Sequence, residues 1–323
     1  MKTRATTKTE KVENDNNSRP WRSLEHALMK RHVLLNRVLG VGLLAVTVLV
    51  PVGQPAQAQG KKSKDLVPPI IFQAAGPIAA SIQSTVDAFR AALGDPNNGN
   101  NPPPLDRSGR REINWDGGNP PVDITTAPVT PFNFFLNTRG GQFTTPGAGL
   151  SQGPASGGPQ GGLEVLFNNP TYGATFSAFS PLRLFTPVDS NITEALFFVP
   201  GANPNLQPGA NPAQPATVRG FGAVFTDVDK PNGIGRGGRR GNTRGASTLM
   251  EYFDVDGRLI FSSFVPPSPG DASLSFFGIV FDEPLIARVR ITTGDTAPGP
   301  DDDEKRDIVM MDDFIYGEPQ PLF

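Results

Sequence analysis

Four oxygen-bearing residues near the two ends of the predicted core domain could together bind a metal ion. Asn114 and Asp116 stand at the entrance to this domain, whereas Asp312 and Asp313 lie in its last predicted strand. First and last segments of antiparallel sandwiches often run close together, and Ca²⁺ takes about six to eight oxygen ligands, backbone carbonyls included. The sequence therefore predicts a Ca²⁺ site here, without EF-hand spacing. The alternative is a solvated turn, or carboxylates paired with Arg110 and Arg111.

A rare tryptophan stands between two of these candidate ligands. Trp115 belongs to the charged, glycine-containing segment Arg110–Gly118. An aromatic face suits the apolar face of a pyranose, so Trp115 is a candidate sugar-stacking residue, with Arg111 as a second ligand-binding residue beside it. The alternative, which we favour for Trp115, is that the ring covers one end of the core.

The amino-acid composition excludes several kinds of catalytic site. Cysteine is absent, and both histidines, His26 and His32, precede residue 59, where we expect the mature protein to begin. Ser-His-Asp and Cys-His nucleophilic sites therefore cannot be built, nor can histidine or thiolate metal sites. A glycosidase would need two facing carboxylates about 5 to 9 Å apart. Alternation places Glu251 and Asp254 on different strand faces, so no such pair is recognisable.

An export signal is the clearest feature of the first 58 residues. The apolar run Val38–Val50 follows basic residues and leads to Ala56-Gln57-Ala58. This is the positive, apolar, small-x-small order of a secretory signal peptide. We expect cleavage after Ala58, translation from Met29, and a secreted or periplasmic protein. The alternative, an N-terminal membrane anchor, needs about 20 apolar residues.

The remaining chain would be acidic. Residues 59–323 contain 20 Lys and Arg against 27 Asp and Glu. An acidic protein binds polyanions poorly, so nucleic acid is not an expected partner. The Arg-Gly-rich stretch 235–245 resembles RNA-contacting segments, but it lacks stacking aromatics and is interpreted as a solvated loop. We also expect no membrane span after residue 58.

Hydrophobic periodicity changes along the chain from helical to strand-like. Steps of three, four and seven residues predict one amphipathic helix over Ile70–Leu93, which a Pro/Asn/Gly-rich linker follows. From Arg110 the period is two, most clearly over Leu285–Thr292. Leu249–Phe253 and Leu259–Phe264 flank an Asp-Val-Asp-Gly sequence, which is a hairpin signal.

Other period-two runs complete the prediction of an all-β domain. They include Leu163–Phe167, a strand with Leu196 and Phe198 on one face, and a last strand over Ile308–Tyr316. About nine to eleven short strands indicate an antiparallel two-sheet sandwich or jelly roll, preceded by one amphipathic helix. Three long loops are expected, at 144–162, 200–215 and 230–245.

Three segments carry a resemblance to a known group of proteins. They are Arg110–Gly117, Arg219–Asp227 and Met310–Gly317. They resemble segments of uncharacterised exported bacterial β-sandwich proteins, and the last two are similar to domains found upstream of PEP-CTERM sorting tails. The resemblance implies a concanavalin- or galactose-binding-like domain of extracellular association with no established activity. The sequence shows no apolar tail before Phe323, so a sorted, anchored fate is not expected.

These features lead to one functional expectation and two alternatives. The predicted parts are the signal peptide 1–58, a helix and linker over 59–105, the sandwich domain 106–318 and a tail, 319–323. We expect a non-catalytic module that binds an extracellular ligand, either a glycan or an envelope component, with carbohydrate favoured. The first alternative is a structural cell-surface or matrix protein. The second is a carboxylate-based glycan hydrolase or lyase.

Overall fold

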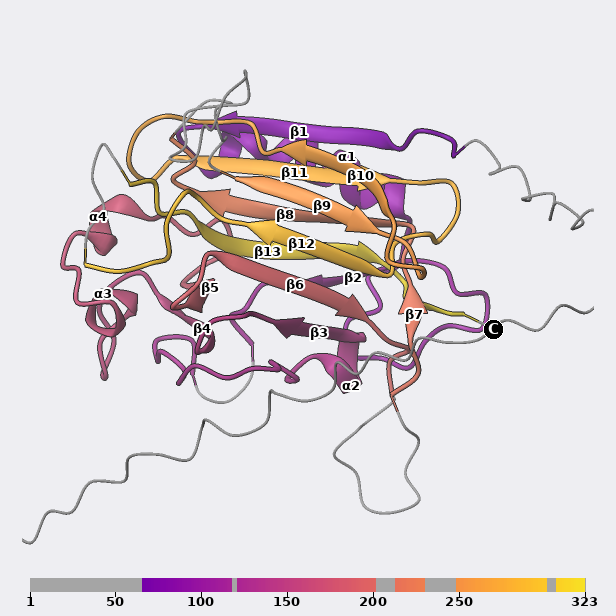
Figure 1. The fold of residues 1–323 in the computed structure, drawn as a ribbon, viewed down its shortest axis with the longest axis horizontal. Helices are drawn as coiled ribbons and strands as arrows, with labels where there is room; N and C mark the ends of the chain where they lie inside the picture. Colours follow the sequence, from indigo (N-terminus) through magenta and orange to yellow (C-terminus); the bar gives the residue numbers. More distant parts are fainter. Residues whose placement is uncertain (1–65, 118–120, 202–212, 230–247, 301–305, 323) are drawn as a thin grey trace, which may run out of the picture. The chain divides into compact units, whose positions relative to one another are not determined.

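The computed structural model describes residues 66–117, 121–201, 213–229, 248–300 and 306–322, which belong to one compact unit. Two antiparallel sheets pack face to face as a sandwich (Figure 1). The predicted signal peptide and the Arg-Gly stretch lie outside the described residues. The expectation of a mostly β fold with an N-terminal helix is confirmed.

The larger sheet, called sheet A, has seven strands. Its order from edge to edge is β1 (Ile70–Gly76), β11 (Leu274–Val280), β8 (Gly220–Thr226), β13 (Met310–Gly317), β5 (Arg183–Val188) and β4 (Gly149–Pro154), with β2 (Arg110–Ile113) also paired to β13. The register of β13 shifts between Met311 and Phe314, at a β-bulge. On one side β13 therefore pairs with β5 before the bulge and with β2 after it.

The smaller sheet, called sheet B, has five strands. Its order is β10 (Leu259–Phe264), β9 (Leu249–Phe253), β12 (Arg288–Thr292), β6 (Ile192–Phe197) and β3 (Gly141–Thr144). The predicted hairpin of β9 and β10 and the predicted alternation of β12 are both confirmed. A separate two-stranded ribbon pairs β7 (Ala216–Thr217) with β14 (Gln320–Pro321).

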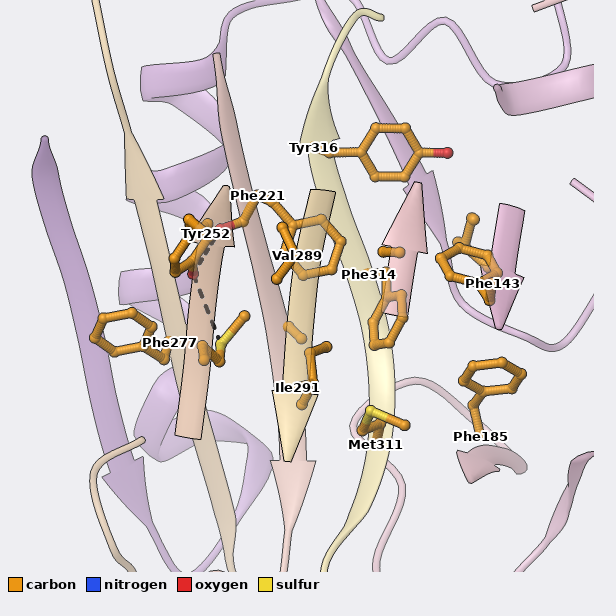
Figure 2. Packing of buried hydrophobic residues seen from close by; sticks show 14 of the residues in the cluster. Phe143, Phe185, Phe221, Tyr252, Phe277, Val289, Ile291, Met311, Phe314 and Tyr316 are labelled. Carbon is orange, nitrogen blue, oxygen red and sulfur yellow. Dashed lines mark hydrogen bonds between the residues drawn. The ribbon is translucent and has the colours of Figure 1, made fainter. Parts of the chain in front are cut away.

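The core between the sheets is rich in aromatic side chains. Alternate residues of facing strands point inward, so that Phe221 and Phe314 of sheet A lie opposite Tyr252, Val289 and other side chains of sheet B (Figure 2). The hydroxyl of Tyr252 donates a hydrogen bond to the carbonyl oxygen of Phe221 at 3.3 Å, which links the two sheets. Burying these rings provides most of the driving force for packing the sheets together.

A helix covers part of the face of sheet A that is turned away from sheet B. Helix α1 (Ala79–Leu93) buries Ile82, Val86, Phe89 and Leu93 against β8, β11 and β13. The ring of Phe89 lies over the paired glycines Gly222 and Gly278, where an added Cβ would come within 2.9 and 2.8 Å of its carbons. These two positions therefore require glycine for the helix to approach so closely.

The predicted helix over Ile70–Leu93 is wrong in its first third, which forms strand β1. Phe72 and Ala74 pack toward the α1 cluster, whereas Ile71 and Gln73 remain exposed. Pro77 follows the last strand residue, Gly76, and lacks the backbone N–H that further strand pairing would need. Gly76 lies so close to Ser81 that an added Cβ would come within 2.3 Å of the Ser81 Cβ. The β-branched pair at the beginning of the segment favours the extended conformation.

Short helices cover the rest of this face of sheet A. Helix α3 (Leu163–Leu166) and helix α4 (Tyr172–Thr175) form a cluster with Leu184 and Met310. The predicted strand over Leu163–Phe167 is therefore wrong. Leu163 and Phe167 are buried at helical spacing and Val165 is exposed, which a short run with only three apolar positions could not reveal. A third short helix, α2 (Leu136–Arg139), precedes β3.

Candidate functional site

The most open sheet surface in the described residues is the face of sheet B that is turned away from the core, called here the outer face. The three hydrophobic clusters contain none of its side chains, whereas α1, α3 and α4 cover the corresponding face of sheet A. Strand alternation dictates its composition, since Met250, Tyr252, Val289 and Ile291 point inward and their neighbours point outward.

The strand register arranges the outer face in three rungs that run across the strands. The first rung contains Gln142, Leu196, Arg288, Phe253 and Leu259. The second contains Thr144, Glu194, Arg290, Glu251 and Ser262. The third contains Ile192, Thr292, Leu249 and Phe264. A polar and charged rung therefore lies between two rungs that carry large apolar side chains.

Ion pairs fix three charged side chains of the outer face, Glu194, Arg288 and Arg290. Glu194 Oε1 accepts hydrogen bonds from Arg288 at 2.5 Å and from Arg290 Nε at 2.9 Å. The guanidinium of Arg288 also lies 4.0 Å from the ring centre of Phe253, in a cation–π contact. Shared contacts of this kind hold both guanidinium groups in place without a ligand, which lowers the entropy lost on binding.

Glu251 differs from the other charged residues of this rung. It stands opposite Arg290 in the register, yet its carboxylate makes no hydrogen bond or ion pair with any residue that the structure describes. It is only half-buried. A carboxylate in this position can accept hydrogen bonds from a ligand's hydroxyl or amide groups, beside a guanidinium that is already oriented.

The structure places Trp115, one predicted ligand-binding residue, inside the core. Its ring has 0% exposed surface and stacks on Phe185 with 3.7 Å between the ring centres. The rings of Phe132, Phe135, Phe143 and Phe314 surround it edge-on. No face of the indole is open to a sugar in this structure, and its position is the one described by the core-covering alternative.

Arg111, the second predicted ligand-binding residue, is paired inside the protein. Its guanidinium donates hydrogen bonds to both carboxylate oxygens of Glu318, at 2.6 and 2.7 Å, and both side chains are fully buried. It also donates to the carbonyl oxygens of Gly99 and Asn101. These bonds connect the linker before β2 to the segment after β13. In this structure the guanidinium of Arg111 therefore holds parts of the fold together.

The four predicted calcium ligands do lie in one neighbourhood, which the pairing of β2 with β13 brings together around Ser180. Asp312 accepts hydrogen bonds from the backbone N–H groups of Phe179 and Ser180, at 2.6 and 3.2 Å. The Ser180 hydroxyl also lies 3.2 Å from Asp312 Oδ1 and 3.3 Å from the carbonyl oxygen of Asn114. Asp116 accepts a hydrogen bond from the backbone N–H of Arg183 at 2.8 Å.

Other groups of the protein already contact these carboxylates. Asp313 lies 3.4 Å from the guanidinium of Arg90, so it already has a charged partner. Within the described ranges, no group of three or more His, Cys, Asp or Glu side chains is arranged to hold a metal ion. Calcium binding by this chain stays a prediction, and the function proposed below does not depend on it.

Burial shifts the pKa values of Asp312 and Asp313 upward. Desolvation, with repulsion from Asp313, raises the pKa of Asp312 well above its ordinary value, although its hydrogen bonds oppose the shift. Burial likewise raises the pKa of Asp313, against the attraction of Arg90. Both residues stand at the bulge of β13.

The raised pKa values predict a pH-dependent stability. The folded protein keeps these protons to higher pH than the unfolded chain, whose aspartates titrate near about 3.9. Stability from this source is therefore present at low pH and is lost as the pH rises through the interval between the unfolded and folded pKa values. We expect the melting temperature to fall more between about pH 4 and about pH 8 in the wild type than in Asp312→Asn.

The control for this experiment is Asp282→Asn, which changes an exposed aspartate in the turn before β12. Its pH profile should follow that of the wild type. An Asp312→Asn profile that also follows the wild type would contradict the assignment.

The chain matches no protein-family model, no curated protein and no solved structure. The resemblance to exported sandwich proteins thus stays an expectation from the sequence. Among the described residues, no helix is long and apolar enough to cross a membrane. The functional argument therefore depends on the geometry of the outer face.

Sequence reasoning identified parts of this surface without assembling it. The alternation over Leu285–Thr292 places Arg288 and Arg290 on a solvent-facing row, and alternation separates Glu251 from Asp254. Leu196 was assigned to an alternating apolar row with Phe198, but Ala195 and Phe197 point inward and Leu196 points outward. The missing information was which strands are neighbours, because β12 lies between β9 and β6, which are distant in sequence.

Proposed function

We propose that this protein is a secreted or periplasmic, non-catalytic binding module of the jelly-roll type, whose outer face binds extracellular carbohydrate. The observation that carries the proposal is the row Glu194–Arg290–Glu251 between two apolar rungs on an open sheet face. The jelly-roll assignment is supported by the last three long strands, β11, β12 and β13, which alternate between sheets A and B.

The chemistry of a sugar ring fits such a surface. A pyranose has apolar C–H faces and neighbouring hydroxyl groups at its rim, so it needs apolar side chains and charged hydrogen-bonding groups side by side. Phe264 and Leu259, at the two ends of β10, offer exposed apolar surface. Glu251 and the oriented Arg290 offer an acceptor and donors between them. Charge-assisted hydrogen bonds of this type are the stronger ones in sugar-sized ligands.

One observation favours the alternative of a structural surface protein. Strand β1 forms an edge of sheet A and leaves apolar residues exposed, as a surface for association would. Self-association and carbohydrate binding use different sheets and can be measured separately. The two functions are therefore distinguished by experiment and do not exclude each other.

The change Glu251→Gln tests the proposed site. We expect roughly tenfold weaker binding of the best glycan ligand, because a charged hydrogen bond contributes about 1.5 to 3 kcal/mol and about 1.4 kcal/mol is tenfold in affinity. The melting temperature should change little, since Glu251 bonds to no described residue. Titration calorimetry on residues 59–323 measures the affinity.

The matched control is Glu283→Gln, which makes the same chemical change at an exposed residue before β12. This variant should bind as the wild type does. Equal affinities of Glu251→Gln and the wild type would contradict binding at the outer face. Equal losses of affinity in Glu251→Gln and Glu283→Gln would contradict it as well.

A further inference from the structure

We propose that two copies of this protein associate through β1, so that sheet A continues across a twofold axis from one copy into the other. Strand β1 stands at the edge of sheet A and pairs with β11 in a regular register from Ile70 opposite Val280 to Gly76 opposite Leu274 (Figure 1). No other described strand pairs with it. As far as the described residues show, one row of its backbone N–H and C=O groups is thus open for pairing.

Three other sheet edges in the described ranges carry features that obstruct such pairing. Strand β4, at the opposite edge of sheet A, is bridged by a segment in which Val129 pairs with Leu150. Strand β3 is bridged in the same way by Phe132. Strand β10 has an irregular register between Leu259 and Phe261. These are covers and bulges of the kind that block edge-to-edge association.

Within the part of the chain that the structure describes, strand β1 has none of these protections. Its sequence, Ile-Ile-Phe-Gln-Ala-Ala-Gly, holds no charged residue and no proline, and its register with β11 shows no bulge. Ile70 and Ile71 are 58% and 48% exposed, and Val67 just before them is exposed as well. An open, regular and apolar edge of seven residues is the type of strand that pairs with another strand.

The side chains of β1 identify a second copy as the occupant. In antiparallel pairing centred on Gln73, Ile70 would face Gly76, Ile71 would face Ala75 and Phe72 would face Ala74 of the other copy. Each large residue thus meets a small one, and each Gln73 meets its equivalent, whose side-chain amide can both donate and accept hydrogen bonds. A strand with evenly distributed large residues would lack this self-complementarity.

The arrangement leaves the proposed binding surface free. The outer face belongs to sheet B, and its rungs include no residue of β1. A dimer would present two outer faces, and two linked weak sites bind a polymeric ligand more tightly than one. The dimer itself does not depend on carbohydrate binding, so either proposal can fail alone.

The first test measures the mass of residues 59–323 in solution by light scattering and sedimentation. We expect a dimer in the wild type and a shift to monomer, at least tenfold in dissociation constant, in Ile70→Lys and in Ile71→Lys. Lysine on an edge strand prevents pairing, and both side chains are exposed enough to be replaced without unfolding. Val165→Lys, at a residue 62% exposed on α3, is the control and should remain dimeric.

The second test uses the absence of cysteine from the chain. Gln73→Cys places one thiol at the proposed axis, opposite its copy, where directly facing Cβ atoms lie about 4.5 to 5.5 Å apart. A short thiol-reactive cross-linker, whose reach covers this separation, should give a covalent dimer of Gln73→Cys and none of Val165→Cys. A monomeric wild type, a dimer that both lysine variants retain, or an uncross-linked Gln73→Cys dimer would each overturn the proposal. Pairing of β1 with a different protein would appear as the first of these outcomes.

Discussion

Replacing Arg111 by methionine is expected to destabilise the folded protein by about 3 to 5 kcal/mol, because it leaves the carboxylate of Glu318 buried without its charged partner. Arg111 and Glu318 are both 0% exposed and are joined by two hydrogen bonds. The same change removes the donors to the carbonyl oxygens of Gly99 and Asn101. Chemical denaturation followed by circular dichroism measures the free energy of unfolding.

Two further variants show whether the loss comes from the unpaired charge. The double change Arg111→Met with Glu318→Leu removes both charges and should recover a large part of the stability. Arg258→Met removes an exposed arginine that pairs with Asp254 and Asp256 in the β9–β10 turn, and it should have little effect. An Arg111→Met protein as stable as Arg258→Met would contradict the buried pair.

The change Trp115→Ala is expected to cost about 3 to 5 kcal/mol, since it removes the largest side chain of the core and leaves a cavity. The indole is surrounded by five aromatic rings, of which Phe185 is stacked on it. Trp115→Phe keeps an aromatic ring there and should cost clearly less. Denaturation under the same conditions as for Arg111→Met compares the two.

The wild type offers an independent check of this environment. Trp21 and Trp115 are the two tryptophans of the chain, so residues 59–323 contain Trp115 alone. Its fluorescence should be blue-shifted and shielded from a soluble quencher until the protein unfolds. An emission spectrum and a quenching constant equal to those of free tryptophan would show that the ring is exposed, which would restore it as a candidate platform for a sugar.

The sequence predicts secondary structure correctly where the pattern depends only on residues close together in the chain. The Asp-Gly turn and its two flanking strands, and the alternation around Val289 and Ile291, are local properties and were predicted correctly. Asn114 and Asp312 were also expected to be neighbours, since first and last segments often meet in sandwiches. The helix prediction is wrong over Ile70–Gly76 because the apolar residues there fit both the helical and the strand period. Pairing with β11 makes this segment a strand.

The candidate site could not be predicted, because it depends on contacts distant in sequence. Trp115 and Arg111 are residues of binding type, but their burial is decided by Phe185 and Glu318, which lie far along the chain. Conversely, Arg290 and Glu251 look ordinary in sequence and become a pair only when β12 is placed beside β9. Residue type alone therefore selects buried side chains as ligand-binding candidates. It also misses surface side chains that become neighbours only when the strands pair.

The most direct measurement of the central claim is a glycan array probed with residues 59–323 of the wild type and of Arg290→Met. The account predicts reproducible binding of the wild type to one class of glycan and loss of that binding in Arg290→Met, with Arg258→Met binding as the wild type does. Because Arg290 is fixed by Glu194 on the open face, its removal takes away donors that a ligand would use. A blank array for the wild type, or unchanged binding by Arg290→Met, would contradict the account.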